Sequence, residues 1–471
     1  MATEAMVKAI EIAIFNGTGE GQPLGVLKDN RVTAVITLTP EEYASWNGWH
    51  KVKGKMKIIV TVKQVPDTSG KVAVNADGQL FRMYCLKVVP KEFDGEGTAA
   101  SPYLIRNKAD LDKVFHAVDT ELYDYTGTHF RVEGDIDFAG VQGFRGYSNT
   151  APAYAFNGVL DGNGHTIRNL VQAVPTSASV TGAFMVYTGP ASEVKNFTVD
   201  NSCRFVGGSY VGFVAQAHGL LQGIVNLADV TAYNDGAAGI ACQLAATGKV
   251  TGCYNAGRIR GARRYTAGIV GIAARGSEIR GCQNSGNVTN AIFGPFSDDP
   301  EQLIYTGGIL GEGAGNVSDC LNQGMIVGAD HTGGIAGDFT ANAETGLQGC
   351  VNTGIVLENG TDGTRGAIIG SPYGNDQSLV RNNYYDAQFS ALAAAANNAH
   401  AGVRAMQTAQ LTAGSRLEGC DDALWQFAAG SYPVLKAFAS QPASQWYAAA
   451  RVEFATSPRV ESRFDKRTDA V

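Results

Sequence analysis

The chain has 471 residues, of which 44% are hydrophobic and 17% charged, with 59 glycines and a formal net charge of −7. The hydrophobic share excludes a disordered chain, and the combination of abundant glycine with few charges favours a fold of many tight turns. An acidic chain without a basic stripe is not expected to bind nucleic acid. There is no run of 18 apolar residues, so no membrane span is predicted.

Residues 1–92 are predicted to form a small β-rich, sandwich-like domain. The opening residues Met1–Lys8 lack the basic and apolar regions of a secretory signal. Either a signal has been removed, or the protein needs none, as in a phage structural protein. The expected strands, rich in Val, Ile and Thr, are Lys8–Phe15, Arg31–Leu38, Lys55–Lys63 and Gln79–Val89. Thr39–Glu42 has the order of a helix-capping box and predicts one short helix.

Residues 93–127 are predicted to be a linker followed by a capping helix. Asn107 is a natural N-cap, and Lys108–Val118 places Leu111, Val114 and other apolar residues on one helical face. Because only strands are expected after this single amphipathic helix, its apolar face needs a partner. The open end of a β-helix would supply one.

Residues 128–386 carry two interleaved repeats. The first, Cys-x-Asn-x-Gly, occurs within Gly252–Gly257, Gly281–Gly286, Asp319–Gly324 and Gly349–Gly354. The second, a small residue followed by Gly-Ile and an apolar residue, occurs at Ala238–Ala241, Ala267–Val270, Gly307–Leu310 and Gly333–Ala336, with weaker copies at Val211–Val214 and Gly366–Ile369. Short apolar strands between glycines bury their inner face only when successive repeats stack. The prediction is an all-β chain containing a parallel, right-handed β-helix of about nine coils, with strands about 4.8 Å apart.

The cysteine and asparagine of the first repeat are two residues apart and therefore point to the same side of a strand. Stacking is expected to align Cys253, Cys282, Cys320 and Cys350 in one inward file, and Asn255, Asn284, Asn322 and Asn352 in a second. Paired amides avoid the cost of about 1–3 kcal/mol for each unsatisfied buried group. The glycine that follows is expected at a corner with positive φ. Since zinc ligands must converge on one point, these files predict no metal site, and no cofactor is predicted.

Several further segments resemble GLUG-repeat surface proteins, which are common in Bacteroidetes and Firmicutes. The similar segments are Asp94–Thr98 with Tyr103–Ile105, Gly134–Asp137, Phe156–Ile167, both repeats, and a closing stretch of Trp425–Phe427 with Gly430–Leu435. The resemblance spans about residues 94–436 and implies a parallel β-helix at an extracellular or cell-surface location, but no particular activity. Residues 387–440 are expected to form a C-terminal cap, and residues 441–471 a polar tail.

No catalytic constellation is predicted. A glycoside hydrolase would need a pair of carboxylates, and the candidate pairs are Asp298 with Asp299, Asp330 with Asp338, and Asp229 with Asp235. All six residues are interpreted as loop or turn residues. The glycine cluster Gly311–Gly315 is interpreted as a corner. No nucleophile elbow, phosphate loop or zinc-hydrolase motif occurs.

Two segments are candidates for ligand binding. One is the basic-aromatic cluster Arg263, Arg264 and Tyr265. The other is the longer interval between Cys282 and Cys320, an insertion of the kind that solenoids place on a binding face; it contains Phe293, Phe296, Asp298, Asp299 and Tyr305.

The sequence therefore favours a non-enzymatic surface protein that presents a β-helix face to a glycan or protein on a host or bacterial surface. Two alternatives stay open. One is a phage fibre or capsid-decoration protein, trimeric if a fibre and located on the virion, with residues 1–92 as the attachment domain. The other is a polysaccharide lyase or hydrolase.

Overall fold

The computed structural model describes residues 32–36, 59–62, 84–88 and 93–441, apart from residues 150–152, 154, 175–176, 178, 180, 291–303, 344, 359–362, 375 and 391. The chain divides into two compact units, Met1–Tyr103 and Leu104–Val471.

The described part of the first unit is one antiparallel sheet in the order β1-β3-β2. Its strands are β1 (Val32–Ile36), β2 (Ile59–Val62) and β3 (Tyr84–Val88). Each lies inside one of the predicted strands, which confirms three of the four. The predicted strand Lys8–Phe15 and helix Thr39–Glu42 lie outside the described residues, and a sandwich arrangement stays a prediction.

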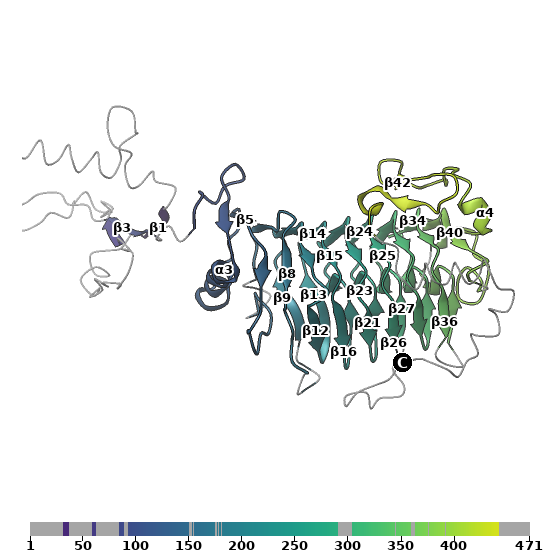
Figure 1. Ribbon diagram of the computed structural model, residues 1–471, viewed down its shortest axis with the longest axis horizontal. Helices are drawn as coiled ribbons and strands as arrows, with labels where there is room; N and C mark the ends of the chain where they lie inside the picture. Colours follow the sequence, from purple (N-terminus) through teal and green to yellow (C-terminus); the bar gives the residue numbers. More distant parts are fainter. Residues whose placement is uncertain are drawn as a thin grey trace, which may run out of the picture. The chain divides into compact units, whose positions relative to one another are not determined.

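The second unit opens with the predicted capping helix, α3 (Lys108–Glu121). The side chain of Asn107 accepts a hydrogen bond from the backbone N–H of Asp110 at 3.1 Å, as expected of an N-cap. The buried residues of α3 are Leu111, Val114, Phe115 and Val118, which form the apolar face that the periodicity predicts. The Phe115 ring stacks on Tyr147 at 4.4 Å, so this face packs on the first coils of the β-helix (Figure 1).

Four parallel sheets run along the β-helix, two with ten strands, one with six and one with twelve. Sheet A consists of β4 (Tyr103–Ile105), β5 (His129–Val132), β7 (Val159–Asp161), β10 (Glu193–Lys195), β14 (Leu220–Gln222), β19 (Lys249–Thr251), β24 (Glu278–Arg280), β29 (Asn316–Ser318), β34 (Leu347–Gln348) and β39 (Val380–Arg381). Sheet B consists of β6 (Ile136–Asp137), β8 (Thr166–Arg168), β11 (Thr198–Val199), β15 (Val225–Asn226), β20 (Tyr254–Asn255), β25 (Gln283–Asn284), β30 (Leu321–Asn322), β35 (Val351–Asn352), β40 (Asn383–Asp386) and β41 (Val403–Met406). Sheet C consists of β12 (Arg204–Gly207), β16 (Asp229–Ala232), β21 (Ile259–Gly261), β26 (Val288–Asn290), β31 (Ile326–Gly328) and β36 (Val356–Glu358).

The fourth sheet, sheet D, is bent into two wings that share the long strand β13 (Ser209–Ala217). Wing 1 continues through β17 (Ala237–Ala238), β22 (Thr266–Ala267), β27 (Tyr305–Gly307), β32 (His331–Gly333) and β37 (Arg365–Gly366). Wing 2 contains β9 (Thr181–Thr188), β18 (Ala241–Leu244), β23 (Val270–Ala273), β28 (Leu310–Gly313), β33 (Ala336–Thr340) and β38 (Ile369–Tyr373). The Gly-Ile phrases lie at the bend between the wings, where one strand ends and the next begins.

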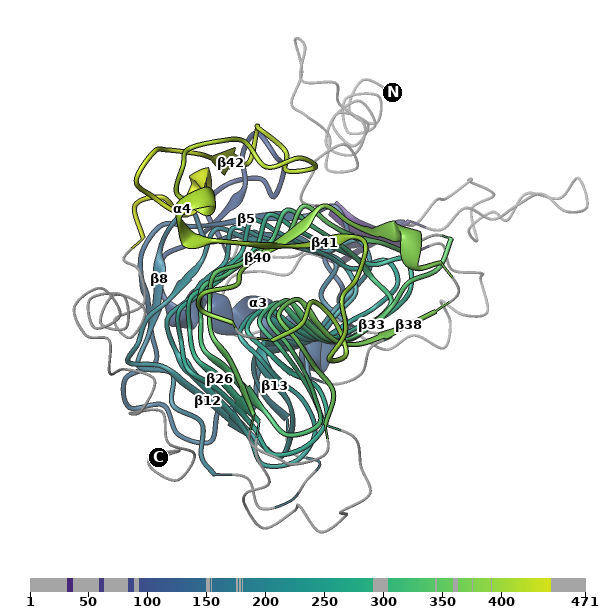
Figure 2. The same ribbon diagram turned by 90° about the vertical axis from the view of Figure 1, so that its right-hand side faces the viewer.

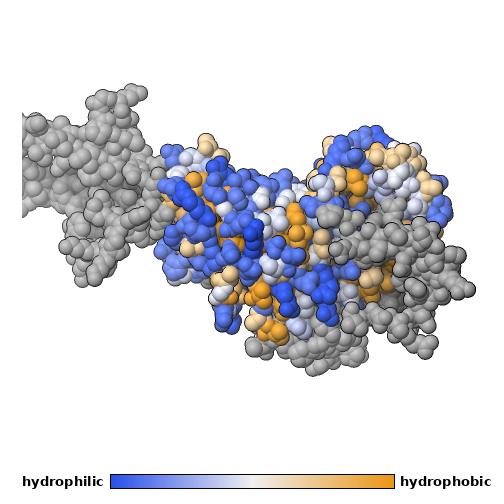
Figure 3. All heavy atoms as spheres, in the orientation of Figure 1, coloured by the Kyte–Doolittle hydropathy of each residue, from blue (hydrophilic) through white to orange (hydrophobic). Residues whose placement is uncertain are grey.

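Figure 2 looks along the axis from the C-terminal end of the β-helix, and the chain passes counterclockwise through sheets A, B, C and D as it approaches the viewer. The coil is therefore right-handed, as predicted. Hydrophilic residues cover most of the described surface in Figure 3, interrupted by small apolar patches. The core consequently lies inside the coils, where each sheet contributes its inward residues.

The predicted asparagine file is confirmed as a continuous hydrogen-bonded ladder inside sheet B. Each amide Nδ2 donates to the Oδ1 of the next coil at 2.8 Å, from Asn226 through Asn255, Asn284 and Asn322 to Asn352. The last amide donates to the backbone carbonyl of Ala367 at 2.8 Å. Asn226, which precedes the first complete repeat, was not among the predicted residues.

The predicted cysteine file is confirmed as well. Cys253, Cys282, Cys320 and Cys350 are free thiols with no exposed surface, and Cys282 contacts both Cys253 and Cys320. Burial raises the pKa of the Cys253 and Cys320 thiols well above the usual value. Because only a thiolate is a good nucleophile or metal ligand, the protonated thiols of Cys253 and Cys320 act as small core residues.

The expectation for the repeat glycines was wrong in one respect. The left-handed corner lies one residue before the cysteine, as at Gly281 with a φ of 62° and Asp319 with a φ of 53°. The glycine that ends the phrase is needed for close packing instead. A Cβ on Gly286 would lie 2.1 Å from the carbonyl oxygen of Gly257 in the preceding coil, so any side chain there would push the coils apart.

The C-terminal segment covers the outer face of sheet B. Its elements after β41 are α4 (Thr408–Leu411), β42 (Trp425–Gln426), β43 (Val434–Leu435) and η4 (Lys436–Phe438), whereas η3 (Gln377–Leu379) precedes β39 in the last coil. Trp425 is 2% exposed and belongs to an apolar cluster with Tyr254, Leu321 and Val351, whose positions in their strands alternate with the inward asparagines. β41 pairs with β40 and ends sheet B, so residues 387–441 both extend the last coil and shield one flank.

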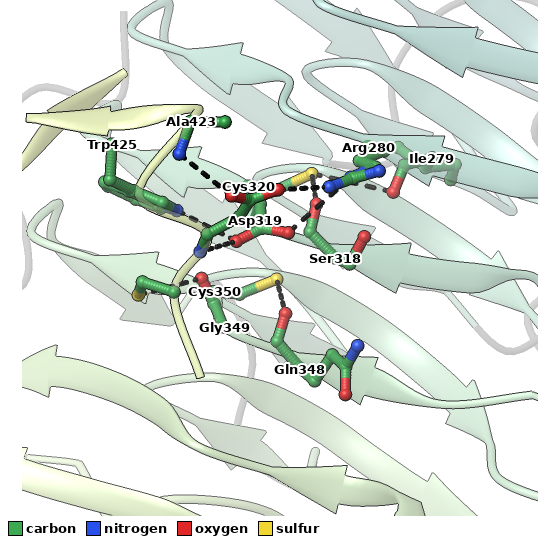
Figure 4. Close-up of polar contacts among 12 residues, drawn as sticks. Ile279, Arg280, Ser318, Asp319, Cys320, Gln348, Gly349, Cys350, Ala423 and Trp425 are labelled. Carbon is green, nitrogen blue, oxygen red and sulfur yellow. Dashed lines mark hydrogen bonds and ion pairs between the residues drawn. The ribbon is translucent and has the colours of Figure 1, made fainter. Parts of the chain in front are cut away.

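One polar contact group holds this segment to the coils (Figure 4). The Asp319 side chain lies between Trp425 and Arg280, and its Oδ1 accepts hydrogen bonds from Trp425 Nε1 at 3.1 Å and from the Asp421 backbone N–H at 2.8 Å. Arg280 also forms an ion pair with Asp421 at 2.5 Å. Asp319 therefore occupies the corner position at which other coils have glycine, and its side chain anchors the C-terminal segment to the coils.

Candidate functional site: a groove along wing 2

Wing 2 carries one file of partly exposed side chains along the axis of the β-helix. The strand register pairs Gln216 with Gln243, Gln243 with Ile272, Ile272 with Glu312, and Asp338 with Ser371. Leu310 pairs with Ala336, which places Glu312 beside Asp338 two residues further on. The next residues along these strands, including Leu244 and Phe339, are buried, so the file faces outward.

This file lines a groove of about 540 Å³. The polar and apolar groups that line it include Gln216, Gln243, Ile272, Glu312, Asp338 and Thr340. His218 and the alanines at the turn into sheet A form another part of its lining. The groove thus offers two amides, an aliphatic side chain and two carboxyls in sequence along one direction.

The two carboxyls of the groove differ in environment. Asp338 is 4% exposed, and burial followed by the negative charge of Glu312 raises its pKa to about 7, although a hydrogen bond with Ser371 opposes the shift. Burial also raises the pKa of Glu312, while the positive charge of Arg264 lowers it. No Lys or Arg nitrogen within the described part of the chain lies at ion-pair distance from either carboxyl.

Wing 1 places the side chain of Tyr305 near the two carboxyls. Tyr305 and His331 occupy successive rungs, and their rings stack at 5.3 Å. Burial raises the pKa of Tyr305 to about 12, with the negative charges of Glu312 and Asp338 as the next causes, so the phenol faces the two acids and stays protonated. A Cβ on Gly311 would lie 3.0 Å from the Cα of Tyr265, so glycine allows the wings to meet closely at the bend.

The structure brings part of the predicted binding set together. Arg264 and Tyr265 share a side-chain hydrogen bond, and Arg264 interacts electrostatically with Glu312, as Tyr305 also does. Arg263 instead donates through Nη1 to Asn234 Oδ1 at 2.9 Å. The other candidates, Phe293, Phe296, Asp298 and Asp299, lie outside the described residues and stay predictions.

The interpretation of Asp338 as a turn residue was wrong, because it lies within the strand β33. Asp330, by contrast, accepts a backbone hydrogen bond from Ile304 at 2.9 Å, and Asp229 pairs with Arg258 at 2.7 Å, so both have local structural roles. Glu312 was missed because it stands between glycines. The sequence did hold a signal: Gln243, Ile272, Glu312 and Asp338 each lie three residues after the isoleucine of a Gly-Ile phrase.

No family model matches the chain, so the resemblance to GLUG-repeat proteins stays a prediction. One curated relative is halomucin from Haloquadratum walsbyi, which is 32% identical over 152 residues, or 30% of this chain. The matched part spans 2% of the length of halomucin. A crystal structure of a Bacteroides ovatus protein, described as an immunoglobulin A1 protease, superposes with a TM-score of 0.47 and 17% identity over 73% of this chain and 94% of that one.

None of the described helices is both long and apolar enough to span a bilayer.

Proposed function

We propose that this protein is a secreted or surface-exposed β-helix that binds a glycan chain in the groove along wing 2. The observation that carries the proposal is the file of Gln216, Gln243, Ile272, Glu312 and Asp338, which follows the axis inside a groove of about 540 Å³. The likeness to halomucin and the resemblance to GLUG-repeat proteins support the extracellular part of the proposal.

The chemistry of the groove suits a polyhydroxylated, uncharged chain. Amides donate to and accept from hydroxyl groups, carboxylates accept from them, and Ile272 gives the apolar face of a sugar ring a surface to contact. Successive coils are about 4.8 Å apart, close to the length of one pyranose unit in an extended chain. Because Glu312 and Asp338 carry negative charge when they are ionised, an acidic polysaccharide would be repelled from this end of the groove above about pH 7.

Replacing both amides, in Gln216→Ala with Gln243→Ala, is expected to weaken glycan binding. Each lost hydrogen bond costs about 0.5–1.5 kcal/mol, so the double variant should lose about 5- to 150-fold in affinity. Ile272→Trp, which fills the groove, should abolish binding. The measurement is an array of neutral oligosaccharides, followed by titration calorimetry with the tightest ligand.

Gln222→Ala is the matched control, because Gln222 is an exposed glutamine on β14 of sheet A. It should bind as the unchanged protein does. If the control and the groove variants bind equally well, or if the protein binds no array member, the proposal is wrong.

A further inference from the structure

We propose that Glu312 and Asp338 are the nucleophile and the general acid/base of a glycoside hydrolase that cleaves the bound glycan with retention of anomeric configuration. This rests on the proposed glycan binding and adds turnover to it. The inference comes from the spacing and the unequal environments of two carboxyls within one groove.

The spacing follows from the strand register. β28 and β33 are neighbours in wing 2, and the pairing of Leu310 with Ala336 aligns Glu312 with Asp338. Side chains aligned on adjacent strands are separated by about the interstrand distance of 4.8 Å. Retaining glycosidases place their carboxyls about 5–5.5 Å apart, whereas inverting enzymes need about 6.5–9.5 Å to admit a water molecule. The spacing of neighbouring coils is therefore close to the separation that retaining enzymes use and shorter than the one that inverting enzymes need.

The different environments of Asp338 and Glu312 suit them to the roles of general acid and nucleophile, respectively. Asp338 is the more deeply buried carboxyl, and its pKa of about 7 keeps a large fraction protonated near neutral pH, as a general acid requires. Burial also raises the pKa of Glu312, but the positive charge of Arg264 opposes that shift and favours the carboxylate that a nucleophile requires. The other groups facing the pair are Ser371, which hydrogen bonds to Asp338, and the protonated phenol of Tyr305.

The groove extends from this pair toward Gln216, three coils from Glu312 along the register. Three coils span about 14 Å, which is room for two or three sugar rings. Gln243 and Ile272 would hold the rings next to the scissile bond. The binding residues and the carboxyls thus lie on one continuous path.

The reaction balances with water as the only co-reactant. A Glu312 carboxylate oxygen attacks the anomeric carbon, forming a glycosyl ester while the bond from that carbon to the glycosidic oxygen breaks. The carboxyl proton of Asp338 passes to the departing oxygen, which leaves as an alcohol. Asp338 then takes a proton from water as the water oxygen attacks the anomeric carbon, which releases Glu312 as a carboxylate. Two displacements at one carbon retain its configuration.

The first test uses the full chain and a panel of 4-nitrophenyl glycosides of neutral hexoses and N-acetylhexosamines in both anomeric forms. At least one should release 4-nitrophenolate, and proton NMR should show the first sugar product with the anomeric configuration of the substrate. Glu312→Gln should lower kcat by about 1000-fold or more. A 2-deoxy-2-fluoroglycosyl fluoride of the matching sugar should add one fluoroglycosyl group to the peptide that contains Glu312.

Asp338→Asn tests the general acid. Its kcat should fall by about 100- to 10,000-fold for a poor leaving group such as 4-methoxyphenol, but much less for 2,4-dinitrophenol, which needs no protonation. Added azide should restore turnover of the dinitrophenyl glycoside and yield a glycosyl azide of retained configuration. The decline of kcat/KM above about pH 7, which reports the raised pKa of Asp338, should disappear in this variant.

Glu278→Gln is the matched control for folding and handling, because Glu278 lies on sheet A of the preceding coil and pairs with Lys249 at 3.2 Å. It should leave kcat unchanged. An inverted product, or full kcat in both groove variants, would overturn the inference. So would the absence of turnover across the panel by a protein that still binds neutral glycans, which would leave the proposed function standing.

Discussion

Asn284→Asp is expected to destabilise the β-helix at neutral pH more than any surface substitution. The amide of Asn284 donates to Asn322 Oδ1 at 2.8 Å and to the carbonyl of Gly286 at 2.9 Å, and accepts from Asn255 Nδ2 at 2.8 Å. A carboxylate has no donor, so it would face two acceptor oxygens with a buried negative charge. We expect a loss of several kcal/mol in the free energy of unfolding, measured by denaturant titration.

The loss should depend on pH in a defined direction. Burial raises the pKa of the new carboxyl in the folded state above its unfolded value of about 3.9. The unfolded chain therefore releases the proton first, and stability should fall as the pH rises from about 4 through the folded pKa. Below pH 4 the protonated carboxyl can donate one hydrogen bond, and the variant should be nearest to the unchanged protein.

Asn316→Asp is the matched control, because Asn316 is exposed on β29 and its Oδ1 accepts from the Gly346 N–H, which a carboxylate can also do. This variant should differ from the unchanged protein by less than about 0.5 kcal/mol. Equal effects of the two substitutions would show that the ladder does not contribute as described.

Trp425→Ala is expected to release the C-terminal segment from sheet B. The substitution removes a fully packed indole and the hydrogen bond to Asp319, at a cost of about 3–5 kcal/mol. Because the segment packs on the outside of the coils, the loss should be local. Hydrogen exchange should accelerate across residues 407–438, while the amides of the asparagine ladder strands keep their protection.

Phe427→Ala provides the comparison, since Phe427 stacks on Trp425 at 6.2 Å but is only partly buried. Phe427→Ala is expected to accelerate hydrogen exchange in residues 407–438 less than Trp425→Ala does. Uniform acceleration in both the segment and the coils after Trp425→Ala would contradict a separable covering segment.

The fold was largely predictable because its core files repeat within short phrases. Each phrase holds Cys and Asn two residues apart, so the inward direction of Cys253 and Asn255 follows from strand geometry alone. The prediction placed the corner with positive φ a few residues too late in each repeat. Glycine occurs both at left-handed corners and where two coils pack closely, and the residue type alone does not distinguish these two uses.

The groove was not predicted, because its residues differ from coil to coil. Gln243, Ile272, Glu312 and Asp338 each follow a Gly-Ile phrase at the same distance, but only Glu312 and Asp338 share a chemical group, so the repeat marks the position without predicting the residue type. The sequence interval that contains residues 291–303 also makes one repeat longer than the others. A constant repeat length therefore does not align Ile272 with Glu312. Only the strand pairing shows that Glu312 and Asp338, 26 residues apart in the sequence, are neighbours.

The one-rung-per-coil register makes the rod modular in length. Asn255 and Asn284 are 29 residues apart, and excising residues 254–282 would remove one rung from every sheet. The amides, thiols and aliphatic side chains above and below the excision would meet partners of their own type. The outer file would lose Ile272 and bring Gln243 beside Glu312, so the number of coils sets the length of the groove and, under the proposed function, the longest glycan that it would hold.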